Sequence, residues 1–204
     1  MKKTFLYFLL PLIYLSACCP GGEDNEYKRV AVSLKESVPY QTGQTVKFLD
    51  SDGSTYTLNV DRELQEEYGE FNKCSGQTLE FLNIQLKNQS VSPFMRFGTN
   101  YTTDEQMTIE VQTKAFNGGG NYHIFHYFMN QDGSFQCGER FNYVYTCHPT
   151  FTIGNTEYTD VLEINQKELG NDEEQTILKL FYSQTKGVLQ YEFLNGKTVT
   201  LSEI

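Results

Sequence analysis

The chain contains 204 residues, of which 39% are apolar and 21% charged, and 26 acidic against 16 basic side chains give a net charge of −10. This length suits a single domain, and 14 Tyr with 15 Phe exclude a chain that stays disordered. Collagen and coiled coil are excluded because no Gly-X-Y period or heptad run is present. A pI near 4.8 argues against a nucleic-acid partner, since phosphate binding requires clustered Lys and Arg.

Residues 1–17 have the pattern of a secretory signal peptide. Lys2 and Lys3 precede an apolar run that ends at Ala17 and is shorter than the about 20 residues that a bilayer span requires. The run closes with Leu15-Ser16-Ala17-Cys18, which resembles a bacterial lipobox. The resemblance implies cleavage before Cys18 and lipidation of its thiol, which would hold the mature chain on a membrane. The alternative is an ordinary secretory signal that happens to precede a cysteine.

Residues 18–28 are expected to form a lipidated, flexible tether, because Pro, Gly and acidic residues there cannot bury a core. The segment resembles the acidic tether of surface-exported lipoproteins of the Bacteroidota. Cys19 occupies the position after Cys18, where the common inner-membrane retention signal has Asp. The expected location is therefore the outer membrane, on its periplasmic or its cell-surface face.

From residue 29 to residue 204, apolar and polar residues alternate in short runs, which is typical of strands with one buried and one solvent-exposed face. The sequence predicts one all-β domain of about ten strands, built as an antiparallel sandwich or an open half-barrel. Turn dipeptides separate the runs at Asp52-Gly53, Asp132-Gly133, Gly154-Asn155 and Asn195-Gly196.

One segment, Asp61 to Gly69, has a helical pattern. Asp61 could cap a helix, Leu64, Tyr68 and Phe71 would lie on one face, and Gly69 could end it. A polar hairpin loop is the alternative. The polar, acidic stretch from Asn165 to Gln175 predicts an exposed loop.

Cys74, Cys137 and Cys147 are the candidates for an intramolecular disulfide, which an oxidising compartment outside the cytoplasm permits. If residues 137–147 form one strand, their ends lie about 33 Å apart, so only a turn at Gly138 would bring them together. We therefore predict that any disulfide joins Cys74 to Cys137 or Cys147 and leaves Cys19 unpaired. Three buried thiols are the alternative.

The sequence predicts no metal, no cofactor and no catalytic residue. His123 and His126 have a zinc-like spacing, but positions i and i+3 of a strand face opposite sides. His148 follows Cys147 directly, so in a strand it faces away from that thiol and cannot activate it. The stretch Asp50-Ser51-Asp52-Gly53, with Asp61 at the twelfth position, resembles a calcium loop, but the alternation of residues 55–60 favours a plain hairpin turn. Serine-hydrolase and phosphate-binding motifs are absent.

The C-terminal third resembles the closing strands of uncharacterised Bacteroidota lipoproteins, and this similarity covers about residues 150–204. The motifs that carry it are Tyr158-Thr159-Asp160-Val161, Leu180-Phe181-Tyr182-Ser183 and Lys186-Gly187-Val188-Leu189. A weaker similarity runs to lipoprotein carriers whose bent antiparallel sheet holds acyl chains. Neither resemblance supplies a functional residue.

These features predict a lipid-anchored, non-catalytic β-domain of the envelope or cell surface with a binding or structural role, whose partner is the membrane and a protein, a glycan or an apolar ligand. The second hypothesis is a carrier of apolar ligands or lipids in an open half-barrel. A carrier requires a large unfilled apolar cavity, whereas a structural module has a packed core. An envelope hydrolase is the third hypothesis and requires a cleft with clustered acids of shifted pKa.

Overall fold

A computed structural model describes residues 26–30, 32–72, 75–87, 91–99, 105–114, 120–130, 133–140, 142–167 and 176–203. The signal peptide, the lipobox at Cys18, Cys19 and Cys74 lie outside the described residues. Thirteen strands form one sheet, and the single helix of the described residues is α2 (Val32–Ser37). The predicted all-β class is confirmed, although the strands are thirteen where the sequence predicted about ten. No helix of the described part is long and apolar enough to span a membrane.

The strands differ greatly in length, from three residues to the eighteen of β3. Their bounds are β1 (Glu26–Lys28), β2 (Thr45–Asp50), β3 (Thr55–Asn72), β4 (Ser75–Lys87), β5 (Val91–Thr99), β6 (Glu105–Lys114), β7 (Gly120–Phe128), β8 (Gly138–Arg140), β9 (Tyr143–Ile153), β10 (Thr156–Gln166), β11 (Ile177–Ser183), β12 (Gly187–Phe193) and β13 (Thr198–Glu203). Strand β1 therefore occupies the last three residues of the predicted tether.

The sheet consists of two antiparallel meanders, which are joined by the pairing of β2 with β13. Its order is β7-β6-β5-β4-β3-β2-β13-β12-β11-β10-β9-β8, so the pairing of β2 with β13 joins the two halves. The short β1 adds a parallel pair to β4, beside the residues that pair with β5. The outer strands β7 and β8 are consecutive in the sequence, and an antiparallel bridge between Met129 and Phe135 starts the connection between them.

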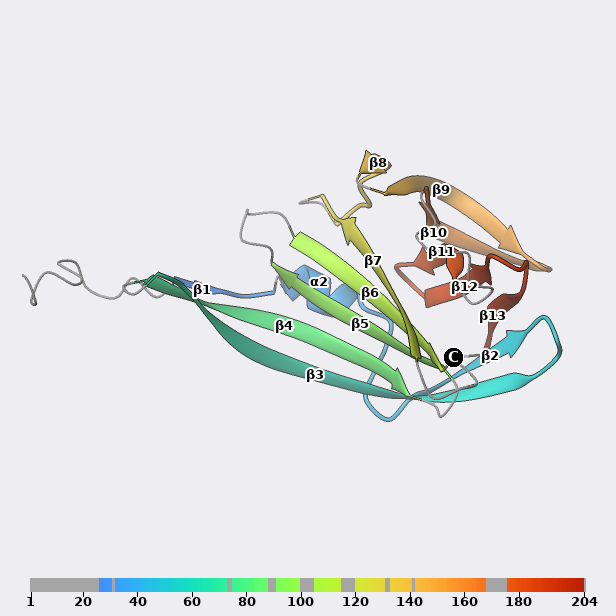
Figure 1. The fold of residues 1–204 in the computed structure, drawn as a ribbon, viewed down its shortest axis with the longest axis horizontal. Helices are drawn as coiled ribbons and strands as arrows, with labels where there is room; N and C mark the ends of the chain where they lie inside the picture. The colour runs from blue at the N-terminus through green and yellow to red at the C-terminus, as the bar shows by residue number, and fades with distance from the viewer. Residues whose placement is uncertain are drawn as a thin grey trace, which may run out of the picture.

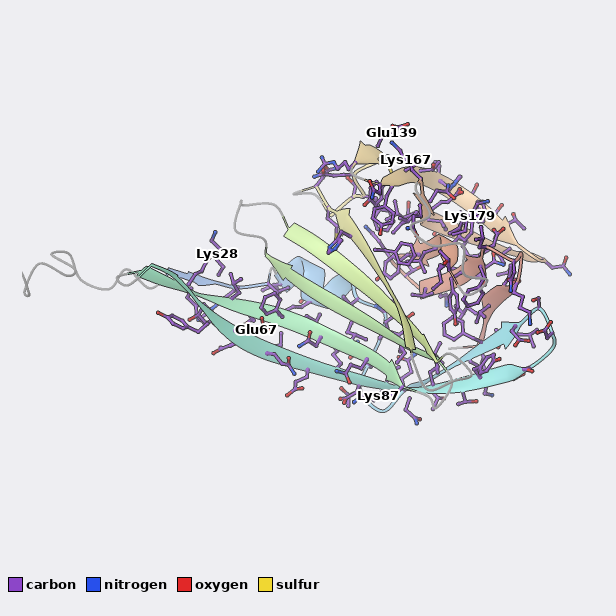
Figure 2. All side chains as sticks on the ribbon, in the orientation of Figure 1. Lys28, Glu67, Lys87, Glu139, Lys167 and Lys179 are labelled. Atoms are coloured by element: carbon purple, nitrogen blue, oxygen red, sulfur yellow. A yellow bond between two sulfur atoms is a disulfide. The ribbon has the colours of Figure 1, made fainter. Side chains whose placement is uncertain are left out.

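We refer to two parts of the molecule as the arm and the head. The arm is the β3–β4 hairpin with β1 and α2, and the head is β2 with β8–β13. Figure 1 shows the long strands of the arm running to one end of the molecule beside β1, while β8–β13 gather at the other end. Figure 2 shows the described side chains crowded between the strands of the head, with Lys167 and Glu139 beside each other at its β8 side. These two residues form an ion pair.

The core lies on the inner face of the head and continues onto the start of the arm. The period-two pattern has a direct physical cause here, because alternate residues of β2 and β3 are buried while their neighbours remain in solvent. Strands β11 and β12 bury consecutive residues, so both of their faces are covered. The largest fully buried side chains are Tyr40, Tyr191, Phe48, Phe125, Leu58, Leu82, Ile84 and Leu86.

Helix α2 is held on the arm by polar contacts as well as by packing. Arg62 of β3 donates hydrogen bonds to the carbonyl oxygens of Lys35 and Tyr40, at 2.6 and 3.0 Å. Lys35 forms an ion pair with Glu80 of β4, whose carboxylate also accepts a hydrogen bond of 3.3 Å from the backbone N–H of Val30. A cation at the carboxyl end of a helix also complements the helix dipole.

Tyr40 connects the segment after α2 with the head. Its side chain is fully buried, and its hydroxyl oxygen accepts a hydrogen bond of 2.8 Å from the backbone N–H of Val188. Gly187 has a φ of +75°, and a Cβ placed there would lie 2.1 Å from the Tyr40 hydroxyl oxygen. Glycine is therefore required at this position for two reasons, the left-handed backbone and the approach of the tyrosine.

The helix predicted for Asp61 to Gly69 is wrong, and so is the alternative of a polar loop, because these residues lie in the middle of β3. Leu64 and Tyr68 are four residues apart, a spacing that places them on one face of a strand as well as of a helix. Both side chains are exposed, at 51% and 57%, so burial does not fix this segment. Its pairing with β4, unbroken from Asn59 to Glu70, satisfies its backbone groups and outweighs the helix propensity of Glu and Gln.

The loop predicted for Asn165 to Gln175 is also partly wrong. Asn165 and Gln166 belong to β10, and Asn165 pairs with Lys179 of β11. Residues 168–175 lie outside the described residues. The glycines of the predicted turns, Gly53, Gly133, Gly154 and Gly196, all have positive φ values between or beside strands, as turns require.

We expect Gly187→Ala to lower the free energy of unfolding more than Gly196→Ala does. Both positions have a left-handed backbone, φ +75° and +82°, but the second has no atom within 4 Å of its Cβ position. The difference between the two variants isolates the collision with Tyr40 and should be about 1–3 kcal/mol, as for other overpacked sites. Urea unfolding of both variants measures it. Equal destabilisation would show that Tyr40 moves aside without cost.

Candidate functional site

The Asp50 turn between β2 and β3 is a hairpin turn, as predicted, and its acids are engaged within the protein. One carboxylate oxygen of Asp50 accepts the backbone N–H groups of Asp52 and Ser54, at 2.9 and 2.8 Å, and the other accepts the hydroxyl of Tyr56 at 2.7 Å. These hydrogen bonds, that of Tyr56 first, lower the pKa of Asp50. Asp52 pairs with Lys197. Both acids therefore stabilise the turn.

The histidines lie on strands, as predicted. Strand β7 contains His123 and His126, which pair with Val111 and Thr108 of β6, so they lie three positions apart along the strand. The backbone carbonyl of His126 accepts a hydrogen bond from the Tyr145 hydroxyl of β9. No group of three His, Cys, Asp or Glu residues among those that the structure describes is placed to hold a metal ion.

The predicted disulfide pairing is wrong, because Cys137 is bonded to Cys147, with Cα atoms 5.7 Å apart. The chain reverses between Arg140 and Tyr143, which pair as the last residues of the β8–β9 hairpin, so residues 137–147 do not form the single strand on which the estimate of 33 Å rested. The reversal is also not at Gly138, which lies within β8. The pairing of Cys74 with either cysteine is excluded in this structure.

A cavity of about 400 Å³ lies beside this disulfide. Its size falls within the range of small-molecule binding sites, roughly 300–1,000 Å³. The loop before β8, strands β9 and β10 and the β11–β12 turn all contribute to its wall. The lining residues are Gly133, Ser134, Phe135, Cys137, Cys147, His148, Pro149, Asp160, Val161 and Gln184.

The loop that forms one wall of the cavity is fixed at several points. The disulfide ties its end to β9, and the side-chain amide of Gln184 donates a hydrogen bond to the carbonyl oxygen of Gly133. The Phe135 ring packs edge-on against Tyr182, with the ring centres 6.2 Å apart. A loop held by a covalent bond, a hydrogen bond and a partly buried ring keeps the wall of the cavity in place without a ligand.

The opposite wall lies where the pairing of β9 with β10 is interrupted. Thr150 pairs with Thr159 and His148 with Val161, but no pair forms between Pro149 and Asp160. Proline has no N–H for the ladder, and Asp160 is the one non-glycine residue of the described part with a positive φ, at 50°. Asp tolerates this backbone better than most residues do. Both residues of the interrupted step line the cavity.

His148 is oriented by a hydrogen bond with Glu163. Its Nε2 lies 2.8 Å from a carboxylate oxygen of Glu163, whose other oxygen accepts a hydrogen bond of 2.8 Å from the Asn165 side chain. The imidazole also packs on Phe151, at 4.8 Å between ring centres, and Phe151 stacks on Phe181 at 4.9 Å. Cys147 and His148 are expected to face opposite sides of the strand, and both border the cavity beside β9.

The arm carries a second exposed feature. Tyr27, Leu64 and Tyr68 are between 41% and 57% exposed, and the Tyr27 hydroxyl donates a hydrogen bond to Glu66. Arg29 lies over the Tyr27 ring, 5.1 Å from its centre. These side chains are exposed to solvent, whereas the head contains a cavity, so the cavity of the head is the better candidate site.

No protein-family model, curated protein or solved structure matches this chain. The function is therefore inferred from the chemistry of the site. The sequence could not have located it, because the loop, the interrupted ladder step and the β11–β12 turn are far apart along the chain. The Cys147-His148-Pro149 run is the only local signal, since proline inside a strand marks an edge or an irregular step.

We expect non-reducing peptide mapping to recover a Cys137–Cys147 cross-linked peptide. Replacing both residues by Ser should lower the free energy of unfolding by about 2–4 kcal/mol, because the bond restricts the unfolded chain. Hydrogen exchange should rise in residues 133–137 and stay unchanged in β3. A cross-linked peptide that contains Cys74, or no change in exchange at the loop, would contradict this assignment.

Proposed function

We propose that this protein is a lipoprotein of the bacterial outer membrane, anchored through Cys18, that binds a small ligand in the cavity of its head without catalysing a reaction. The observation that carries the binding role is the cavity of about 400 Å³ behind a loop that the Cys137–Cys147 disulfide fixes. A disulfide suits an exported protein, because thiols stay reduced in the cytoplasm. The lipobox and the absence of Asp after Cys18 support the location.

The geometry of the arm supports this arrangement. Glu26 of β1 pairs with Gln77 near the tip of the β3–β4 hairpin. The head begins at Asn59 of β3, which pairs with β2 on one side and with Lys87 of β4 on the other. Gln77 and Lys87 lie ten positions apart on β4, which is about 33 Å at 3.3 Å per residue. A chain anchored at Cys18 would thus be attached at one end of the arm and would hold its head away from the membrane (Figure 1).

The carrier hypothesis receives less support from the head. A carrier requires unfilled apolar space, but the inner face of the head is filled by its own side chains. Tyr40, Phe48 and Tyr191 are at most 1% exposed, and burial raises the pKa of Tyr40 and Tyr191. The cavity borders this core at Val161, and charged and polar residues form part of its wall.

The non-catalytic role is supported by how the reactive groups are engaged. Both cysteines that line the cavity are bonded to each other, so neither is available as a thiolate nucleophile.

We expect Cys18→Ala to move the protein from the membrane to the soluble fraction of lysed Gram-negative cells. The acyl chains on Cys18 provide the anchor, and two or more chains are required for stable attachment. Cys19→Ala is the matched control, because it removes the neighbouring thiol and leaves the lipobox intact. Fractionation followed by immunoblotting compares the three proteins. Membrane retention of Cys18→Ala in the same proportion as the wild type would disprove the anchor.

We expect compounds of suitable size to raise the melting temperature of the full-length protein, because a ligand that binds only the folded state stabilises it. A thermal-shift panel of small amines, carboxylic acids, sugars and neutral alcohols measures this. Ser134→Trp places a large side chain on the wall of the cavity and should abolish every shift, whereas Ser51→Trp, in the exposed β2–β3 turn, should retain them. If no compound gives a shift that Ser134→Trp abolishes, the binding function is overturned.

A further inference from the structure

Three side chains that border the cavity each offer a hydrogen-bond acceptor, which restricts the ligand. This inference rests on the proposed binding function and names the chemical class that the site would take. It follows from three side chains, each of which has part of its hydrogen-bonding capacity already engaged. These residues come from β9, β10 and the β11–β12 turn.

The tautomer of His148 is set by its partner. An ionised carboxylate can only accept hydrogen bonds, so the Nε2 atom that lies 2.8 Å from Glu163 must carry a proton. In the neutral imidazole the other nitrogen, Nδ1, then has no proton and is an acceptor. Nδ1 has no hydrogen-bond partner among the described residues.

Gln184 is oriented in a comparable way. Its Nε2 donates to the carbonyl oxygen of Gly133, which places the nitrogen end of the amide at the loop. The amide oxygen has no partner within the described part of the chain and adds a second acceptor to the rim. Pro149 also lines the wall, and it has no backbone N–H and contributes no donor.

Asp160 supplies the charge. Its carboxylate forms no ion pair or hydrogen bond with any described residue, although the residue lines the cavity. Lys186, in the same turn as Gln184, is exposed and does not line it. An unpaired carboxylate in a chain of net charge −10 attracts cations and repels anions.

The rest of the wall is apolar. Phe135, Val161 and the disulfide border the same space, and an aromatic ring also attracts a cation over its face. We propose that the cavity binds a small organic cation, with a primary ammonium or guanidinium group at Asp160 and a short apolar body against Phe135. Such a ligand supplies the donors that the acceptors of the wall require.

Benzylamine, benzyl alcohol and benzoate test this inference, because the three probes share one ring and differ in charge. Calorimetry with the full-length protein in a non-ionic detergent should show benzylamine binding at least about tenfold more tightly than benzyl alcohol, a difference of about 1.4 kcal/mol. Benzoate should not bind. In a ¹⁵N spectrum, the Nδ1 resonance of His148 should shift when benzylamine is added.

Matched variants locate the charge. Asp160→Asn keeps the size of the side chain and tolerates the same backbone, and it should weaken benzylamine binding about tenfold without affecting benzyl alcohol. Glu157→Gln removes one exposed negative charge from the same strand, outside the cavity, and should leave binding unchanged. Equal effects of the two variants, or tighter binding of either other probe, would overturn the cation assignment.

The two proposals fail in different ways. A Ser134-dependent thermal shift with acids or sugars, without one for amines, would overturn the cation and retain the binding function. The absence of any Ser134-dependent shift would overturn both.

Discussion

The structure depends on one buried contact, in which the Tyr40 hydroxyl meets the backbone of Gly187 and Val188. This contact joins residues 148 positions apart, at 2.8 Å, in a place where an unpaired N–H would cost free energy. The carbonyl group of Tyr40 also accepts a hydrogen bond from Arg62, which holds the carboxyl end of α2 through Lys35. One residue thus links the β11–β12 hairpin of the head, the helix and the long β3 strand of the arm.

A second set of contacts joins the outer strand β7 to β9. The outer strand β7 approaches β9 although no ladder joins them, because the Tyr145 hydroxyl donates to the His126 carbonyl group and the Phe125 and Tyr143 rings lie 5.8 Å apart. Burial raises the pKa of Tyr145 to about 12, so its hydroxyl keeps its proton at neutral pH. The sheet stays open, and side-chain contacts rather than a backbone ladder bring β7 close to β9.

The sequence predicted the turns and strands that depend on neighbouring residues alone. Asp52-Gly53 and Asn195-Gly196 form turns because their glycines take positive φ values, and the alternating runs form strands. The disulfide was missed because the reversal at Asn142 has no strong turn dipeptide, so the distance between Cys137 and Cys147 depended on a turn that the sequence does not signal. The part of β3 from Asp61 to Gly69 was missed because a partner strand, not its own pattern, makes it extended.

The position of the cavity follows from how the sheet ends. Strand β8 pairs with β9 only from Tyr143 to Tyr145, so the rest of β9 has no neighbour on that side among the described residues. Exposed strand edges attract other chains, and proline or a covering loop protects them. Here the edge carries Pro149, and the disulfide brings the 133–137 loop against it without continuing the ladder. Protection of the edge therefore leaves a space between loop and strand, and that space is the candidate binding site.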